Sequence, residues 1–233
     1  MKKINYTIKV YDEKSKLGKN VYQIIVSDSY DRAMLFLRPQ EYMECPNPKF
    51  RGKSFNIWDY MKWYSIKFNK GKGFTYGIDW DGFNFPLFSA IECYRKLPKE
   101  YFTEYDHVFL HILGEILQSI DRSDINNIYI ISYGKEGSAT MYHELAHARY
   151  FLSKKYQKMA DKITKSIPDI SKKKIFDNMQ KMGYNKNSMK NEIQAYFRGK
   201  DWINSDITKG VEKGVLLHLH EKYEKYLSKI KVF

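Results

Sequence analysis

The hydrophobic pattern of this chain changes its period along the sequence, and that change limits the folds it can adopt. Residues 5–10 and 21–26 alternate apolar and polar side chains, which predicts two strands of a β-hairpin joined by a polar loop. Residues 128–133 form a short apolar run between turn residues, which predicts a further strand. The apolar residues after this run recur at helical spacing. We therefore expect an α+β protein with a strand-containing first half and a helical second half.

Helices alternate with the strands in the first half, where residues 71–86 should hold one more strand. The predicted helices cover residues 27–37 (ended by Pro39), 55–68, 86–97, 105–120, 139–168, 171–182, 187–197 and 211–230. The chain contains no internal repeat and no clear linker. We therefore expect a single domain over residues 1–233, with an N-terminal α+β part at 1–120 and a second part at 128–233.

The composition indicates a basic globular protein. Forty Lys and Arg against 27 Asp and Glu give a net charge of +13. This charge favours anionic partners such as nucleic acid, acidic proteins or anionic lipid, although lysines spread along a chain are typical of a solvated surface. Zinc-finger spacing, an RNP-type strand and a P-loop are absent. Two cysteines make no disulfide framework, and no signal peptide or membrane-spanning run is present, so we expect a cytoplasmic protein without a membrane partner.

The segment YHELAHARY, residues 142–150, carries two histidines at metal-ligand spacing. On a helix, His143 and His147 stand on one face a single turn apart, where both imidazoles can reach one zinc ion at about 2.0–2.1 Å. Glu144 lies about 100° around the helix from His143, so it misses the metal but can contact a water molecule bound there. The apolar residues on either side indicate a buried helix, in which three unpartnered polar side chains would be costly.

A second histidine pair in the chain has the same spacing. His107 and His111 are also four residues apart, but no glutamate follows the first of them. We interpret this pair as part of an ordinary helix face. The glutamate and a third ligand must therefore distinguish a metal site from a chance pattern.

A catalytic zinc ion needs three protein ligands and one open position. The metzincin pattern is excluded, because its glycine and third histidine would fall on Tyr150 and Ser153. Glu192, in NEIQAYF on a following helix, is the leading candidate for the third ligand. Ala195 is small enough to let that helix approach the first closely. Weaker alternatives lie among lysines, at Glu212, Glu221 and Glu224.

At these residues the chain resembles the gluzincin group of zinc metallopeptidases, with His143, Glu144 and His147 in HELAH and Glu192 in NEIQAY. The resemblance covers roughly residues 128–197. It implies a zincin-like fold, one Zn²⁺ per chain held by the two histidines and Glu192, and Glu144 as the general base that activates a zinc-bound water to hydrolyse peptide bonds. It also implies an edge strand that pairs with extended substrate, at Ile130, Ile131, Ser132 and Tyr133.

The resemblance further implies a side chain that supports the oxyanion. Four residues are candidates for that role: Tyr196, His218, His220 and Arg149. The partner would be a protein or peptide substrate, with an acidic or nucleic-acid-associated partner suggested by the charge alone.

Two other interpretations stay open at this point. In one, the chain is a basic module that binds nucleic acid or a protein and has a structural or vestigial zinc site. Glu144 argues against it, because a structural site needs no base beside its ligand. In the other, the motif is a chance match without metal.

Overall fold

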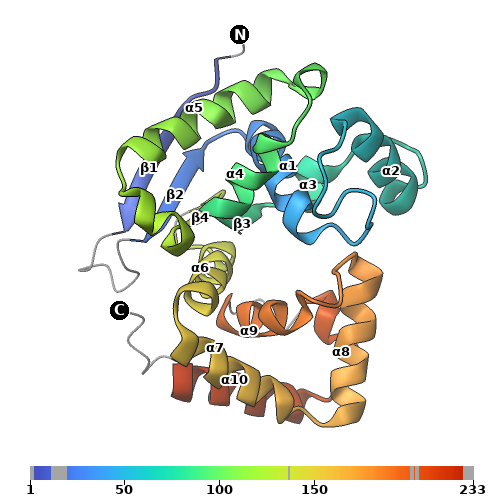
Figure 1. Cartoon of the computed structure of the whole chain (residues 1–233). Coiled ribbons are helices and arrows are strands. Elements are labelled where there is room, and N and C mark those ends of the chain that lie inside the picture. The colour runs from blue at the N-terminus through green and yellow to red at the C-terminus, as the bar shows by residue number, and fades with distance from the viewer. Residues whose placement is uncertain (1–2, 12–19, 136, 200–201, 203–204, 228–233) are drawn as a thin grey trace. The chain divides into compact units, whose positions relative to one another are not determined.

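The computed structural model in Figure 1 describes residues 3–11, 20–135, 137–199, 202 and 205–227. The chain is a mixed α+β protein, mainly helical, as the sequence predicts. It divides into two compact units: Met1–Lys9 with Tyr22–Gly134, and Val10–Val21 with Lys135–Phe233. We had expected the strand at 129–133 to belong with the helix that follows it. It belongs instead to the first unit. That residues 1–233 form one catalytic domain stays a prediction.

The first unit combines the four-stranded sheet with helices. Its strands are β1 (Tyr6–Tyr11), β2 (Val21–Val26), β3 (Gly82–Pro86) and β4 (Tyr129–Tyr133). Its helices are α1 (Ser29–Glu44), α2 (Ile57–Asn69), α3 (Tyr76–Asp79), α4 (Leu87–Arg95) and α5 (Glu104–Gln118), with 3-10 turns η2 (Lys99–Tyr101) and η3 (Arg122–Asn127). β1 and β2 are neighbours, as a hairpin requires. Residues 12–19 of its expected loop lie outside the described residues.

The sheet order is β1-β2-β4-β3, so β4 is a central strand. It runs antiparallel to β3, with Tyr133 opposite Gly82 and Tyr129 opposite Pro86. All five of its residues are buried, and Ser132 donates a hydrogen bond to the carbonyl of Ile24 on β2 (Oγ–O 2.7 Å). The expected substrate-pairing edge at Ile130, Ile131, Ser132 and Tyr133 is therefore wrong. A continuous apolar run is typical of a strand covered on both faces, and such strands lie inside sheets.

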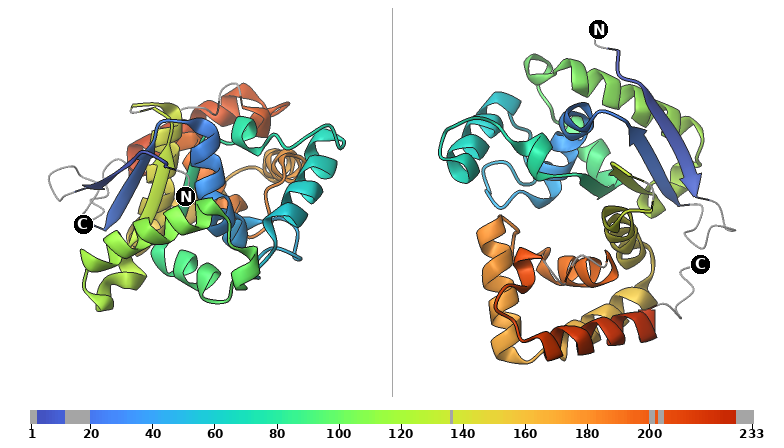
Figure 2. Two further views of the ribbon diagram at one scale, coloured as in Figure 1. Left: turned by 90° about the horizontal axis from the view of Figure 1, so that it is seen from above. Right: turned by 180° about the vertical axis from the view of Figure 1, so that it is seen from behind.

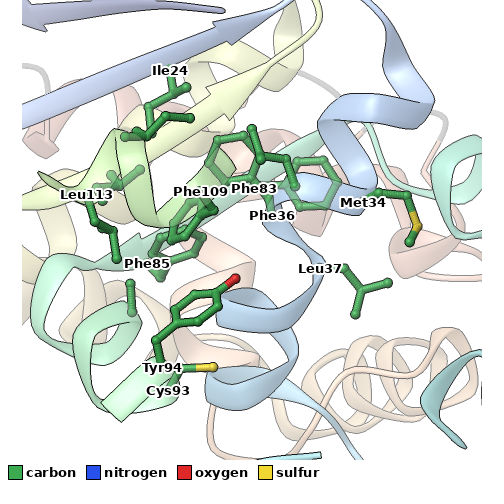
Figure 3. Packing of buried hydrophobic residues seen from close by; sticks show 14 of the residues in the cluster. Ile24, Met34, Phe36, Leu37, Phe83, Phe85, Cys93, Tyr94, Phe109 and Leu113 are labelled. Carbon is green, nitrogen blue, oxygen red and sulfur yellow. The ribbon is translucent and has the colours of Figure 1, made fainter. Parts of the chain in front are cut away.

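Aromatic side chains fill the core of the first unit (Figure 3). Phe36 of α1 stacks on Phe83 of β3 with ring centroids 5.7 Å apart, and Phe109 of α5 meets it edge-on at the same separation. α1 and α5 are thereby fixed against the sheet.

Helix α1 continues five residues beyond Pro39, where we had expected it to end. A proline inside a helix costs about 3 kcal/mol, because it removes one hydrogen bond and its ring clashes with the preceding turn. Two buried side chains offset that cost. Arg38 binds the carboxylate of Asp106 on α5 (Nε–Oδ1 2.7 Å, Nη2–Oδ2 3.0 Å), and Glu41 accepts a hydrogen bond from the hydroxyl of Tyr76 at 2.8 Å.

From Lys135 onward, the described residues of the second unit fold into helices and turns. It contains α6 (Ala139–Leu152), α7 (Lys154–Lys165), α8 (Asp169–Met182), α9 (Met189–Gly199) and α10 (Lys213–Leu227), with the 3-10 turn η4 (Asp206–Thr208). α7, α9 and α10 lie side by side (Figures 1 and 2). Together with α8 they contribute to one apolar core, in which Phe197 stacks on both Trp202 and Tyr223 at 5.5 Å. Gly183, with a φ of 102°, ends α8 as predicted.

One helix was expected from residue 139 to Pro168, and the structure contains two. The break is at Ser153, whose backbone is extended (φ −119°, ψ 106°). Its side chain accepts a hydrogen bond from the backbone N–H of Tyr156, which caps the start of α7. Across the described part of the chain, none of these helices has the length and apolar character that crossing a bilayer demands.

Candidate metal centre

Three ligand atoms converge in the second unit, between α6 and α9. The Nε2 atoms of His143 and His147 are 3.0 Å apart, and the Oε2 atom of Glu192 lies 3.5 and 3.6 Å from them. His147 and Glu192 have side chains 1 % and 3 % exposed, and His143 is 14 % exposed. The structure thus unites the two histidines of the motif with the predicted third ligand. Within the described residues this is the one such cluster of histidine, cysteine and acidic side chains.

The separations of these atoms match a tetrahedral zinc site. Ligands about 2.0–2.1 Å from a tetrahedral metal lie about 3.3–3.4 Å from one another. The observed separations of 3.0, 3.5 and 3.6 Å scatter around that value. Three atoms so spaced share a point about 2 Å from each of them. Two imidazoles and one carboxylate are, moreover, a common ligand set for catalytic zinc. The residues therefore fit the metal that the resemblance implies.

Glu192 is held in the form that binds a metal. Burial alone would raise the pKa of its carboxyl group, but the neighbouring His147 and His143 outweigh that effect and lower it. The buried Oε2 atom makes no hydrogen bond of ordinary geometry, and the Nε2 atoms of His143 and His147 lie 3.5 and 3.6 Å from it. A buried carboxylate needs a positive partner, which is supplied either by the protonated histidines or by a metal ion that the neutral histidines bind.

Gly199 lets α9 pack against α6 at the site. A Cβ atom added there would lie 3.1 Å from the carbonyl oxygen of Ala139 and 3.2 Å from the Cβ atom of His143. Those are closer than ordinary van der Waals contacts, and both neighbours are fixed on helix α6. The side chain of Ser138 caps this helix by accepting a hydrogen bond from the backbone of Met141.

Glu144 is buried beside the ligand pair, with 4 % of its surface exposed. It is not part of the metal-binding cluster. That Glu144 contacts a water molecule on the metal stays a prediction from its position on the helix.

Tyr196 lies against the site, one helical turn after Glu192. Its ring meets the ring of His143 edge-on, with centroids 4.8 Å apart and planes at 88°. Its hydroxyl forms a hydrogen bond with the hydroxyl of Tyr184 at 2.9 Å. Tyr184 follows the glycine that ends α8, and we did not predict a role for it. No local pattern marks it, because its contact with Tyr196 joins the turn after α8 to a residue twelve positions along the chain.

The other three oxyanion candidates lie in different surroundings. Arg149 is about 200° around α6 from His147. Burial lowers its pKa, and its charged neighbours there are Arg198 and Glu224. His218 is exposed on α10, and the ring of His220 packs against Trp202 at 5.1 Å. Of the four candidates, Tyr196 is the one whose ring is seen to contact a histidine of the candidate site.

The alternative third ligands are also placed elsewhere. Glu212 and Glu221 are exposed. Glu224 binds Arg198 through a 2.5 Å hydrogen bond between Oε1 and Nη1. Glu192 is the candidate that joins the histidines.

The second histidine pair is a matched comparison inside the same chain. His107 and His111 are exposed on α5, and the Nε2 atom of His111 lies 3.2 Å from Glu115. They belong to no metal cluster within the described residues. The structure thus places this pair on an exposed helix face, and that it binds no metal stays a prediction.

No protein-family model matches the chain, and searches of curated proteins and of solved structures found no significant match. The function must therefore be argued from the geometry of this chain.

Proposed function

We propose that this chain is a zinc-dependent metallopeptidase with a zincin-like active site, which hydrolyses peptide bonds in a protein or peptide. The convergence of His143, His147 and Glu192 at tetrahedral spacing is the observation that carries this proposal. The buried Glu144 beside the first histidine favours a catalytic centre over a structural one.

The residues would divide the work as follows. His143, His147 and Glu192 hold the zinc ion, which when bound polarises a carbonyl group and increases the acidity of water. Glu144 accepts a proton from the attacking water and passes it to the leaving amine. Tyr196, held by Tyr184, is positioned beside His143 to donate a hydrogen bond to the oxyanion.

Metal content and hydrolysis together test the proposal. We expect about one zinc ion per chain in protein purified without chelator, and loss of that zinc in Glu192→Ala. The matched control is His111→Ala, which removes a histidine from the exposed pair and should leave the zinc content unchanged. Glu144→Gln should keep the zinc and abolish cleavage of a mixed fluorogenic peptide library.

Each result has a separate meaning. Zinc in Glu192→Ala would identify a different third ligand. No zinc in the wild type would rule out the enzyme. Zinc without peptide cleavage in the wild type would indicate the structural site of a basic binding module.

A further inference from the structure

The first unit carries an unusually basic segment around α2. Residues 49–73 contain seven Lys or Arg and one Asp, a net charge of +6 and nearly half of the +13 of the whole chain. Its six lysines are all exposed: Lys49, Lys53, Lys62, Lys67, Lys70 and Lys72. None of their ammonium groups has an ion pair or hydrogen bond with a described residue. The charge of this basic segment is therefore available to an external partner.

Large apolar side chains stand among these lysines. Trp58 is 68 % exposed and Ile66 is 61 % exposed. Together with Lys62 they occupy successive turns on the outer face of α2. The opposite face of the helix is buried through Tyr60 and Tyr64, so the outer stripe is not needed for the core. Figures 1 and 2 show α2 at the opposite end of the first unit from β1.

The chemistry of this stripe distinguishes between polyanions. A lysine ammonium group can bind any polyanion, and the indole ring of a tryptophan can stack on a nucleic-acid base. Ile66 has no π-face, and a nucleic-acid backbone offers it no apolar environment. A lipid interface accepts all three groups: lysines at the headgroups, tryptophan at the interfacial level and the aliphatic chain just below it.

We propose that the basic segment binds an anionic lipid surface, with Trp58 and Ile66 entering the interface and the lysines contacting the headgroups. We had expected no membrane partner because the chain lacks a spanning segment, but a surface contact requires none. The proposal is independent of the zinc site.

Vesicle binding by the full chain tests it. We expect co-sedimentation with vesicles of equal parts phosphatidylcholine and phosphatidylglycerol, none with phosphatidylcholine alone, and release by high salt. The triple variant Lys53→Gln, Lys62→Gln, Lys67→Gln should bind roughly a hundredfold more weakly, since each lysine near an anionic surface contributes about fivefold. The double variant Trp58→Ser, Ile66→Ser should lose at least about tenfold.

The matched control removes the same charge from α7. Lys155, Lys158 and Lys162 are also exposed, and their triple change to Gln should alter binding by less than about threefold if the site is the basic segment. Three results would overturn the proposal: no vesicle binding by the wild type, equal loss in the control, or unchanged binding in the Trp58/Ile66 variant. Binding of single-stranded oligothymidylate that depends on Trp58, without vesicle binding, would identify a nucleic-acid surface instead.

Discussion

Gly199 lies where α9 meets α6, next to His143 of the candidate metal site. In an open helix, replacing glycine by alanine stabilises the protein by about 0.5–1 kcal/mol. Here the new Cβ atom would press on the Ala139 carbonyl and on the Cβ atom of His143. We expect Gly199→Ala to weaken zinc binding, measured by competition with a chromogenic chelator.

The control for that change is Gly114, inside α5, where an added Cβ atom has no neighbour within 4 Å. Gly114→Ala should raise the free energy of unfolding and leave zinc affinity unchanged. Equal zinc affinity in both variants would show that the packing of α9 on α6 does not set the geometry of the ligands.

The hydroxyl groups of Tyr184 and Tyr196 form a hydrogen bond with each other, and the ring of Tyr196 contacts His143. Tyr184→Phe and Tyr196→Phe each remove that bond and should cost similar amounts, about 1 kcal/mol, while the double variant should cost little more than either. Both single variants keep the ring that contacts His143, so zinc content should be retained. Tyr196→Leu removes the ring and should speed zinc release. Additive costs in the double variant would contradict the shared bond.

At the scale of elements, local sequence signals predicted helix ends at Gly183 and before Met189 correctly. They failed at two positions inside predicted helical segments or at their ends, Pro39 and Ser153. Gly183 and the turn before Met189 are backbone signals, and both were correctly interpreted. Pro39 is an equally strong signal and misled, because the buried contacts of Arg38 and Glu41 that carry α1 past it come from residues distant in sequence. At Ser153 the error was the reverse: we predicted one continuous helix, and the structure has two. A serine within a helical pattern does not by itself indicate that it caps a new helix.

The pair Arg38–Asp106 links α1 to α5 and should make stability depend on pH. Burial tends to raise the pKa of Asp106, but the hydrogen bonds and charge of Arg38 outweigh it and hold the pKa below its usual 3.8. A depressed folded-state pKa gives stability that is present above the unfolded value and is lost as the pH falls through the folded value. Asp106→Asn should cost about 3 kcal/mol at pH 7, because it leaves Arg38 buried without its counter-charge.

Guanidinium unfolding between pH 7 and pH 3 measures this prediction. The difference between wild type and Asp106→Asn should shrink as the pH falls, because Asp106 takes up a proton in the unfolded chain before it does so in the folded protein. Glu92→Gln is the control: it breaks an exposed pair with Arg95 and should change stability by less than about 0.5 kcal/mol. A difference that is constant with pH would show that the charge of Asp106 is not what stabilises the pair.

At the scale of the whole molecule, the sequence reached the ligands of the candidate site but not the sheet order. The spacing of the two histidines is a local property of one helix. The third candidate, Glu192, could be identified from the pattern of one other helix. The position of β4 between β2 and β3 depends on pairings between segments far apart in the chain, which no local pattern records. The edge-strand expectation failed for that reason.

All three proposed ligands belong to the second unit, and the proposed zinc site therefore predicts which part of the chain zinc should stabilise. Because the ligands cannot converge in the unfolded chain, zinc binding adds to folding free energy, by about 2.7 kcal/mol at a hundredfold excess of free zinc over its dissociation constant. Hydrogen exchange read by mass spectrometry should therefore show that a chelator exposes amides of α6 and α9. Amides of α1 and α5, in the first unit, should exchange at unchanged rates. His147→Ala should show no response to zinc. Equal protection by zinc in both units would contradict a site that stabilises the second unit alone.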